Sequence, residues 1–215
     1  MKKRLYSFAF GAIASLFLAS APALAHPHVW VTMKSELVYA PDGAITGVRH
    51  AWSFDEMFST FATQGIASKQ KGVFTREELA PLAEVNVTSL KEFEYFNFAK
   101  VNGKKTAFID PKEYWLEFKD SQLTLHFVLP LQTPVKAKDV ELEVYDPSYF
   151  VDFTFAEKDP VALAGAPAQC KLTVGRPQDL NTAQSQRLGE SFFSQLGQGS
   201  AFGAQFANKI SVKCP

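Results

Sequence analysis

The stretch that decides the fold is His28-Val29-Trp30-Val31-Thr32-Met33, which leads to the turn sequence Pro41-Asp42-Gly43 and a returning apolar stretch from Ala44 to Phe54. Apolar and polar side chains alternate from residue 29 onward, which is typical of a strand with one buried face. In the turn, proline fixes φ and glycine accepts a positive φ. The sequence therefore predicts a β-hairpin with strands over residues 29–40 and 44–54.

This hairpin predicts which side chains share one end of the sheet. The strand position opposite His28 is expected near Asp55 and Glu56, whereas the position opposite His50 is expected near Lys34. At about 3.3 Å per residue, His50 would lie about 20 Å from His28 along the strand. The hairpin therefore brings two carboxylates to His28 and leaves His50 far from it.

The remaining pattern predicts an α+β fold of antiparallel β-hairpins and sheets with a few helices. We expect one helix from Asp55 to Gln64 with Met57, Phe58 and Phe61 buried, and another from the capping box at Thr75 to about Ala99. A third helix is predicted over residues 178–196. Strand pairs are predicted over 107–135 and 139–156, and short strands over 170–174 and 209–214. Residues 159–168 are typical of a loop or linker, so a boundary near 157–168 stays open.

The N-terminal residues predict a secretory signal peptide. Lys2, Lys3 and Arg4 precede an apolar run, and Ala23-Leu24-Ala25 closes it with a small-residue cleavage site. The run is short for a membrane span of about 20 residues, which favours cleavage over an anchor. We expect cleavage after Ala25 and a mature periplasmic domain of residues 26–215 that begins with a free α-amine on His26.

Composition narrows the function further. The chain has 22 basic and 22 acidic residues, and loss of the signal peptide would leave a slight acidic excess, so we expect no nucleic-acid partner. The two cysteines, Cys170 and Cys214, predict a disulfide in an oxidising compartment, rather than a thiolate metal site. The sequence contains no nucleophile-elbow, Walker, Rossmann or H-E-x-x-H motif, and we expect no enzyme activity.

The N-terminal histidines point to transition-metal chemistry. The imidazoles of His26 and His28, the α-amine of His26 and a carboxylate oxygen of Asp55 or Glu56 would suit nickel, cobalt, zinc or copper. A solvated terminus is the alternative for the two histidines. Acidic residues also suit the start of a helix, so a capping role for Asp55 is an equal alternative to a ligand role.

Three further residues are reserve candidates for the same site. They are His50, His126 and Asp152, which the hairpin alone does not bring to the terminus but the complete fold could. A lone histidine in a strand is more often a satisfied polar side chain than a ligand. Asp152 lies among aromatic residues, and if it is buried it needs a partner, structural or metallic.

Three stretches of the chain resemble a known bacterial family: His26-Pro27-His28-Val29-Trp30-Val31, Trp52-Ser53-Phe54-Asp55-Glu56 and Tyr145-Asp146-Pro147-Ser148-Tyr149. The family is catalogued as domain of unknown function one-thousand-and-seven, and its members are often labelled periplasmic components of uncharacterised ABC-type transport systems. They tend to accompany permeases of the nickel/cobalt type. The resemblance implies metal handling at the cell envelope, with an inner-membrane metal permease as the partner.

We therefore expect a periplasmic protein that binds nickel, cobalt or zinc and assists a metal permease in uptake or homeostasis. Two alternatives stay open. One is a copper-dependent enzyme that uses the mature N-terminal histidine. The other is a metal-free interaction module whose aromatic side chains dock on a membrane transporter.

Overall fold

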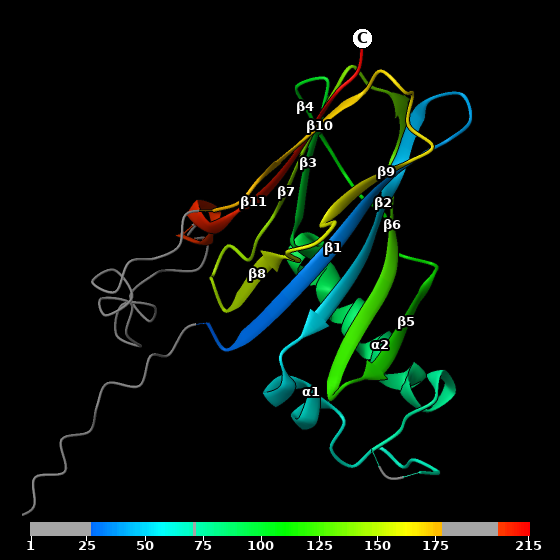
Figure 1. Ribbon diagram of the computed structural model, residues 1–215, viewed down its shortest axis with the longest axis vertical. Helices are drawn as coiled ribbons and strands as arrows, with labels where there is room; N and C mark the ends of the chain where they lie inside the picture. Colours follow the sequence, from blue (N-terminus) through cyan, green and yellow to red (C-terminus); the bar gives the residue numbers. More distant parts are fainter. Residues whose placement is uncertain (1–26, 71, 178–201) are drawn as a thin grey trace, which may run out of the picture.

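The computed structural model describes residues 27–70, 72–177 and 202–215. The predicted signal peptide, His26 and the predicted helix over residues 178–196 lie outside the described residues. Two β-sheets face each other, and two α-helices lie at the end of the molecule away from the C-terminus (Figure 1). This arrangement confirms the predicted α+β class. No helix in the described ranges combines the length and apolar character that a membrane span requires.

The first sheet is built around the predicted hairpin. β1 (Val29–Tyr39) and β2 (Ala44–Phe54) pair antiparallel, with Thr32 opposite Ser53 and Ser35 opposite His50. The strand order is β5-β6-β2-β1-β8, and β9 also pairs with β1. β5 (Tyr114–Lys119) and β6 (Gln122–Lys136) form a second hairpin, while β8 (Val151–Phe155) and β9 (Val161–Ala164) run parallel to β1.

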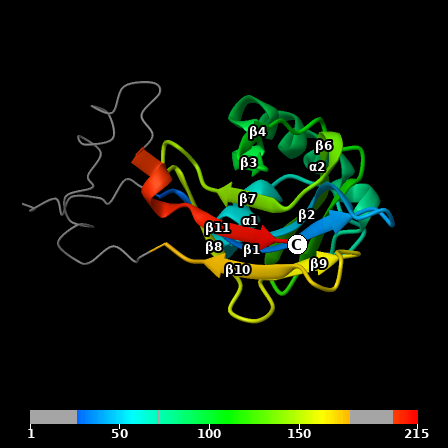
Figure 2. The same ribbon diagram turned by 90° about the horizontal axis from the view of Figure 1, so that it is seen from above.

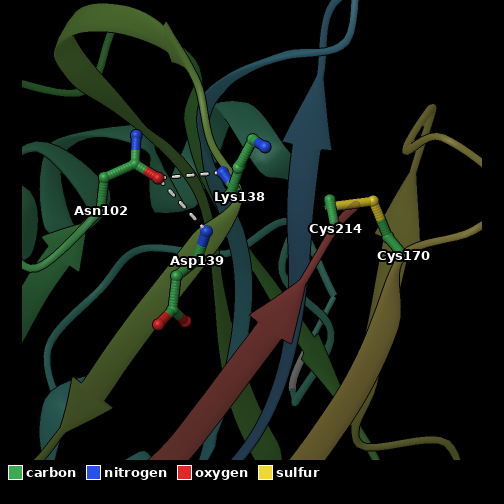
Figure 3. Close-up of a disulfide and its surroundings, with 5 residues drawn as sticks. All are labelled: Asn102, Lys138, Asp139, Cys170 and Cys214. Carbon is green, nitrogen blue, oxygen red and sulfur yellow. Dashed lines mark hydrogen bonds between the residues drawn. A yellow bond between two sulfur atoms is a disulfide. The ribbon is translucent and has the colours of Figure 1, made fainter.

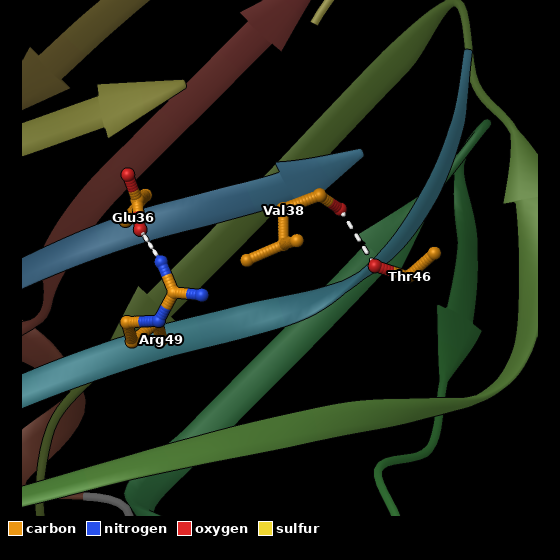
Figure 4. A network of polar contacts seen from close by, with 4 residues as sticks. All are labelled: Glu36, Val38, Thr46 and Arg49. Carbon is orange, nitrogen blue, oxygen red and sulfur yellow. Dashed lines mark hydrogen bonds and ion pairs between the residues drawn. The ribbon is translucent and has the colours of Figure 1, made fainter. Parts of the chain in front are cut away.

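The hairpin carries polar contacts on its solvent side (Figure 4). Arg49 and Glu36 are directly opposite each other and form an ion pair. The hydroxyl of Thr46 donates a hydrogen bond to the carbonyl oxygen of Val38 at 3.1 Å. An exposed ion pair stabilises a fold only weakly, whereas the Thr46 bond lies beside the shift in register after Val38 and supports the strand where it is irregular.

The second sheet has the order β10-β11-β7-β3-β4, and its neighbouring strands are antiparallel. Figure 2 shows these strands following one another from β4 to β10. Their bounds are β3 (Asn97–Val101), β4 (Lys104–Thr106), β7 (Asp139–Val144), β10 (Lys171–Gly175) and β11 (Asn208–Lys213).

A disulfide and the hydrogen bonds of one asparagine side chain stabilise one end of this sheet (Figure 3). A disulfide joins Cys170, just before β10, to Cys214, just after β11, which confirms the predicted bridge. The side-chain oxygen of Asn102 accepts hydrogen bonds from the backbone N–H groups of Lys138 at 2.9 Å and Asp139 at 3.3 Å. Asn102 therefore ties the turn between β3 and β4 to the start of β7.

The core lies between the two sheets and under α2 (Arg76–Leu90). Val31, Met33 and Trp52 face it from the first sheet, and Leu142 and Ile210 face it from the second. Helix α2 adds the buried side chains Leu79, Ala83 and Val87. Its start is the predicted capping box, in which Thr75 and Glu78 each bind the other's backbone N–H.

The prediction that this helix continues to about Ala99 was wrong. Helix α2 ends at Leu90, a 3₁₀ turn η1 (Lys91–Phe96) follows, and residues 97–101 form β3. Glu94, Tyr95 and Phe96 have φ between 52° and 56°, in the left-handed region. Tyr95 and Phe96 are buried in the core, so their tertiary packing overrides the helical pattern of their apolar side chains.

The buried stripe predicted for the first helix was right for Phe58 and wrong for Met57 and Phe61. In α1 (Glu56–Ala62), Met57 and Phe61 are 68% and 74% exposed. Phe58 packs against the core as predicted, Ala62 packs there as well, and Ser59 is buried. The side chain of Asp55 fixes the first turn of the helix, and this sets a rotation in which residues 58, 59 and 62 face inward.

Two further expectations about strands need correction. Residues 139–156 do contain two strands, but β7 belongs to the second sheet and β8 to the first, because the turn after Val144 carries the chain between the sheets. Residues 159–168, expected to be a loop or linker, contain β9. That strand continues the parallel pairing of β8 along β1.

Candidate functional site

The start of β1, the end of β2 and the start of β8 lie at the same end of the first sheet, because β2 runs antiparallel and β8 parallel to β1 (Figure 1). The three sequence stretches that carry the family resemblance lie at this end of the sheet. We call the outward-facing group His28, Trp30, Asp55, Phe150 and Asp152 at this end the His28 corner.

His28 and Asp152 reach the corner on neighbouring parallel strands. Trp30 is opposite Asp152 in the register of β1 and β8, and the backbone N–H of His28 donates to the carbonyl oxygen of Phe150 at 2.9 Å. The rings of His28 and Phe150 are 4.7 Å apart between centroids. With strands about 4.8 Å apart and about 3.3 Å per residue, the Cα atoms of His28 and Asp152 are about 8 Å apart. His28 is exposed and Asp152 half-buried.

The loop before β8 is held by the side chain of Asp146, which is buried. One of its carboxylate oxygens accepts from the backbone N–H and the hydroxyl of Ser148, both at 2.8 Å, and the other accepts from the N–H of Val151 at 3.0 Å. The short helix η2 (Phe202–Phe206) closes over this loop, with the N–H of Gly203 donating to the carbonyl of Pro147 at 2.8 Å. Asp146 is thus structural, and its hydrogen bonds fix the direction in which β8 begins.

Tyr149 lies beneath the corner in the left-handed backbone region, with φ of 60°. Its ring stacks on Phe206 with centroids 4.2 Å apart. Burial, with a further contribution from the negative charge of Asp152, raises the pKa of Tyr149 to about 12. The phenol is therefore neutral at physiological pH.

Asp55 lies beside the start of β1, as the hairpin predicts, but its carboxylate binds backbone amides. One oxygen accepts from the N–H of Phe58 at 2.8 Å and caps α1, and the other accepts from the N–H of Trp30 at 3.1 Å. The N–H of Asp55 itself donates to the carbonyl oxygen of Trp30 at 3.0 Å. The structure therefore shows Asp55 in the helix-capping role that was the alternative to a metal-ligand role. Glu56 is exposed in the first turn of α1.

His50 lies deep in the core, away from the corner. Its Nδ1 is 3.0 Å from the hydroxyl oxygen of Ser35, and its Nε2 is 2.9 Å from the side-chain oxygen of Asn97. The amide nitrogen of Asn97 donates to the carbonyl of Tyr95, so Nε2 of His50 carries the proton and Nδ1 accepts from Ser35. Burial lowers the pKa of His50 to about 3.

The hydrogen-bonded side chains of Ser35, His50 and Asn97 follow one another in the order found in enzymes with a nucleophilic serine or cysteine. Their environment differs from that of a catalytic site. All three residues are at most 4% exposed, and an imidazole with so low a pKa is a poor base at neutral pH. These hydrogen bonds instead link β1 and β2 of the first sheet to β3 of the second. His50 is therefore a structural core histidine.

His126 is also remote from the corner. It lies on β6 and stacks on Trp115 of β5, with centroids 4.8 Å apart and planes 9° apart, and its Nε2 is 3.4 Å from a carboxylate oxygen of Glu117. Of the reserve candidates, the fold brings only Asp152 to His28. Within residues 27–70, 72–177 and 202–215, no three or more histidine, cysteine, aspartate and glutamate side chains gather in a way that could hold a metal ion.

Sequence reasoning placed Asp55 ahead of Asp152, because only the hairpin could be predicted. The parallel pairing of β8 with β1 joins segments more than a hundred residues apart, and no local pattern encodes it. The density of aromatic residues around Asp152 was the one available signal.

Two known proteins that are similar to this chain have names that describe no function. An uncharacterized protein of Haemophilus influenzae is 27% identical over 212 residues, covering 95% of this chain and 98% of that protein. An uncharacterized 15.5 kDa protein of Spirochaeta aurantia is 30% identical over 93 residues, covering 43% of this chain and 66% of that protein. Among solved structures, acetylcholine-binding protein type 1 of Biomphalaria glabrata aligns over 94% of this chain and 90% of its own, with a TM-score of 0.36 and 8% identity, too low to bear on function. The family described as protein of unknown function (DUF1007) matches residues 11–214, and the chain belongs to this family.

Proposed function

We propose that this protein binds one divalent transition-metal ion, nickel, cobalt or zinc, at the His28 corner and exchanges it with an inner-membrane metal permease. His28 would supply an imidazole nitrogen and Asp152 a carboxylate oxygen. The observation that supports the proposal is the register of β1 with β8, which puts His28 and Asp152 on neighbouring strands, two residues apart along the strands, at the end where all three resemblance stretches lie.

The donor set fits such a metal. Imidazole nitrogen with carboxylate oxygen suits zinc, nickel, cobalt and copper, whereas calcium and magnesium prefer oxygen alone. The backbone beneath both residues is fixed, through the bond from His28 to Phe150 and through the Asp146 loop before β8. In the proposed site, His26 adds the third donor, through its imidazole or its α-amine. Asp55 holds β1 and α1 in place and does not itself bind the metal.

The direct test is calorimetric titration of protein isolated from the periplasm, with nickel, cobalt, zinc and copper salts in turn. Mass spectrometry of the same sample would identify its first residue and any bound ion. We expect one ion per chain, and His28→Ala and Asp152→Asn should each weaken binding at least about tenfold, or about 1.4 kcal/mol. If the α-amine of His26 is a ligand, an extra residue placed before His26 should weaken metal binding relative to the unaltered protein.

A matched control is His126→Ala, which removes another accessible histidine from the outer face of the same sheet. It should leave the affinity unchanged. Equal affinity in His28→Ala and the unaltered protein would refute the site. Copper(II) is included because the terminal histidine also supports the alternative of a copper enzyme, which predicts a copper(II) absorption band and turnover with peroxide.

A second candidate function is a metal-free module that docks on a membrane transporter. One observation favours it: of the large apolar side chains that are exposed in the described ranges, four lie on the elements that meet at the corner, namely Trp30, Met57, Phe61 and Phe150. Exposed apolar side chains in one region often mark an interaction surface. This candidate predicts association with the permease that survives chelation and is lost in Trp30→Ala, whereas the metal proposal predicts that chelation abolishes it.

A further inference from the structure

A polar cleft lies at the opposite edge of the first sheet from the His28 corner. It has a volume of about 500 Å³, and its walls are the first turns of α2 and the start of β5. Ala80, Ala83 and Tyr114 supply apolar surface, and Arg76 and Lys112 supply positive charge. The cleft is large enough for a small molecule, and its lining combines this apolar surface with charged side chains.

Arg76 is held in a fixed position in this cleft. Its guanidinium carbon lies 4.1 Å from the ring centroid of Trp115, a cation–π contact. Trp115 is in turn stacked on His126, whose Nε2 lies beside Glu117. The backbone at Arg76 is fixed as well, because the capping box formed by the residues around it sets the first turn of α2.

This arrangement leaves the hydrogen-bonding edge of Arg76 available. A guanidinium that lies over an aromatic ring keeps N–H donors that can bind a carboxylate through two parallel hydrogen bonds. In the part of the chain that the structure describes, the ion pairs involve neither Arg76 nor Lys112. Glu77 and Glu113 also line the cleft, and their negative charge opposes ligands with more than one negative charge.

We propose that this cleft binds a small organic monoanion, a carboxylate carried on an apolar body. Arg76 anchors the carboxylate, Lys112 adds a second positive charge, and Ala80, Ala83 and Tyr114 contact the apolar part. The same chemistry is offered by a free aromatic or aliphatic acid and by the C-terminal residue of a peptide. The site is separate from the proposed metal site, because β5 and β8 are opposite edges of the sheet.

Calorimetric titration of the full mature protein with phenylacetate tests the proposal, with the uncharged phenylacetamide as the matched ligand. We expect phenylacetate to bind, and phenylacetamide to bind at least about tenfold more weakly because it cannot pair with Arg76. Arg76→Gln should cause a similar loss while keeping the capping box, and Lys112→Gln a smaller one. Acetyl-Ala-Phe with a free or an amidated C-terminus then distinguishes a peptide ligand from a free acid, since tighter binding of the free-carboxylate peptide than of phenylacetate indicates a peptide.

Two controls separate this site from the rest of the molecule. Arg49→Gln removes an exposed arginine of the same sheet that is paired with Glu36, and it should leave phenylacetate binding unchanged. His28→Ala should also leave it unchanged, just as Arg76→Gln should leave metal binding unchanged. Absence of phenylacetate and peptide binding at millimolar concentration, or equal binding in Arg76→Gln with its thermal unfolding unchanged, would overturn the proposal.

Discussion

Acidification should destabilise this fold through His50 in particular. The histidine is neutral in the folded core, where its pKa is about 3, whereas its ordinary value is 6.5. Because the folded pKa is the lower one, its contribution to stability is fully present above about pH 6.5 and is lost as the pH falls toward 3. Each pH unit in this window costs about 1.4 kcal/mol, because the unfolded chain takes up a proton that the folded protein excludes. Between about pH 7.5 and about pH 5, the loss is therefore about 2 kcal/mol.

The comparison that isolates this effect is His50→Gln. A glutamine can donate to Asn97 and accept from Ser35, as His50 does, but it does not titrate. Urea unfolding followed by tryptophan fluorescence at about pH 7.5 and about pH 5 gives the change in unfolding free energy for each protein. The unaltered protein should lose about 2 kcal/mol more than the variant, because the effect of the carboxylates is common to both. His126→Gln, at a half-exposed histidine, should behave like the unaltered protein. Equal losses in His50→Gln and the unaltered protein would refute the assignment of His50 as a neutral core residue.

Changes at three other places test how the fold is held together. Replacing Cys170 and Cys214 by serine opens a loop with a sequence separation of 44 and should lower the unfolding free energy by up to about 4 kcal/mol in urea titrations, and reducing agent should no longer affect the variant. Gly203→Ala should cost about 1–3 kcal/mol, because a Cβ atom there would overlap the carbonyl of Asp146, and an unchanged thermal midpoint would contradict the close contact. Asp55→Ala should cost about 1–2 kcal/mol by removing the cap of α1 and weaken metal binding indirectly, whereas Asp55→Asn keeps one acceptor and should cost less.

The parts of the fold that were predictable are those encoded by neighbouring residues. The turn at residues 41–43 predicted the β1–β2 hairpin, but the register beyond it was not predictable, because the irregularity between Val38 and Tyr39 shifts the pairing by one residue and puts Ser35 rather than Lys34 opposite His50. The capping box at Thr75 likewise marked the start of α2. The end of that helix could not be read in the same way, because the three left-handed residues from Glu94 to Phe96 are held by burial in the core and by contacts with other elements.

The residues of the candidate site can be separated in the same way, into those whose position local sequence predicts and those whose position it does not predict. The position of Asp55 beside β1 was predictable because a hairpin joins them, and the structure shows its two oxygens bound to the amides of Trp30 and Phe58. The position of Asp152 was not predictable, because it depends on a parallel strand pair between distant segments. A local sequence pattern thus identified Asp55, which the hairpin places beside β1. The position of Asp152, the second proposed ligand, depends on tertiary structure.

The three resemblance stretches contain more residues that build the corner than residues that could bind a ligand. Val29 and Val31 are buried in the core, Asp55 caps a helix, and Asp146 holds the loop before β8. Matching these stretches in another chain therefore predicts the shape of the corner more directly than its chemistry. His28 belongs to the first stretch and is exposed, and its proposed partner Asp152 lies three residues beyond the last stretch. A relative that keeps the stretches but replaces His28 or Asp152 should fold in the same way and bind the metal poorly, and measuring both properties in such a relative would separate the role of the motif in folding from its role in binding.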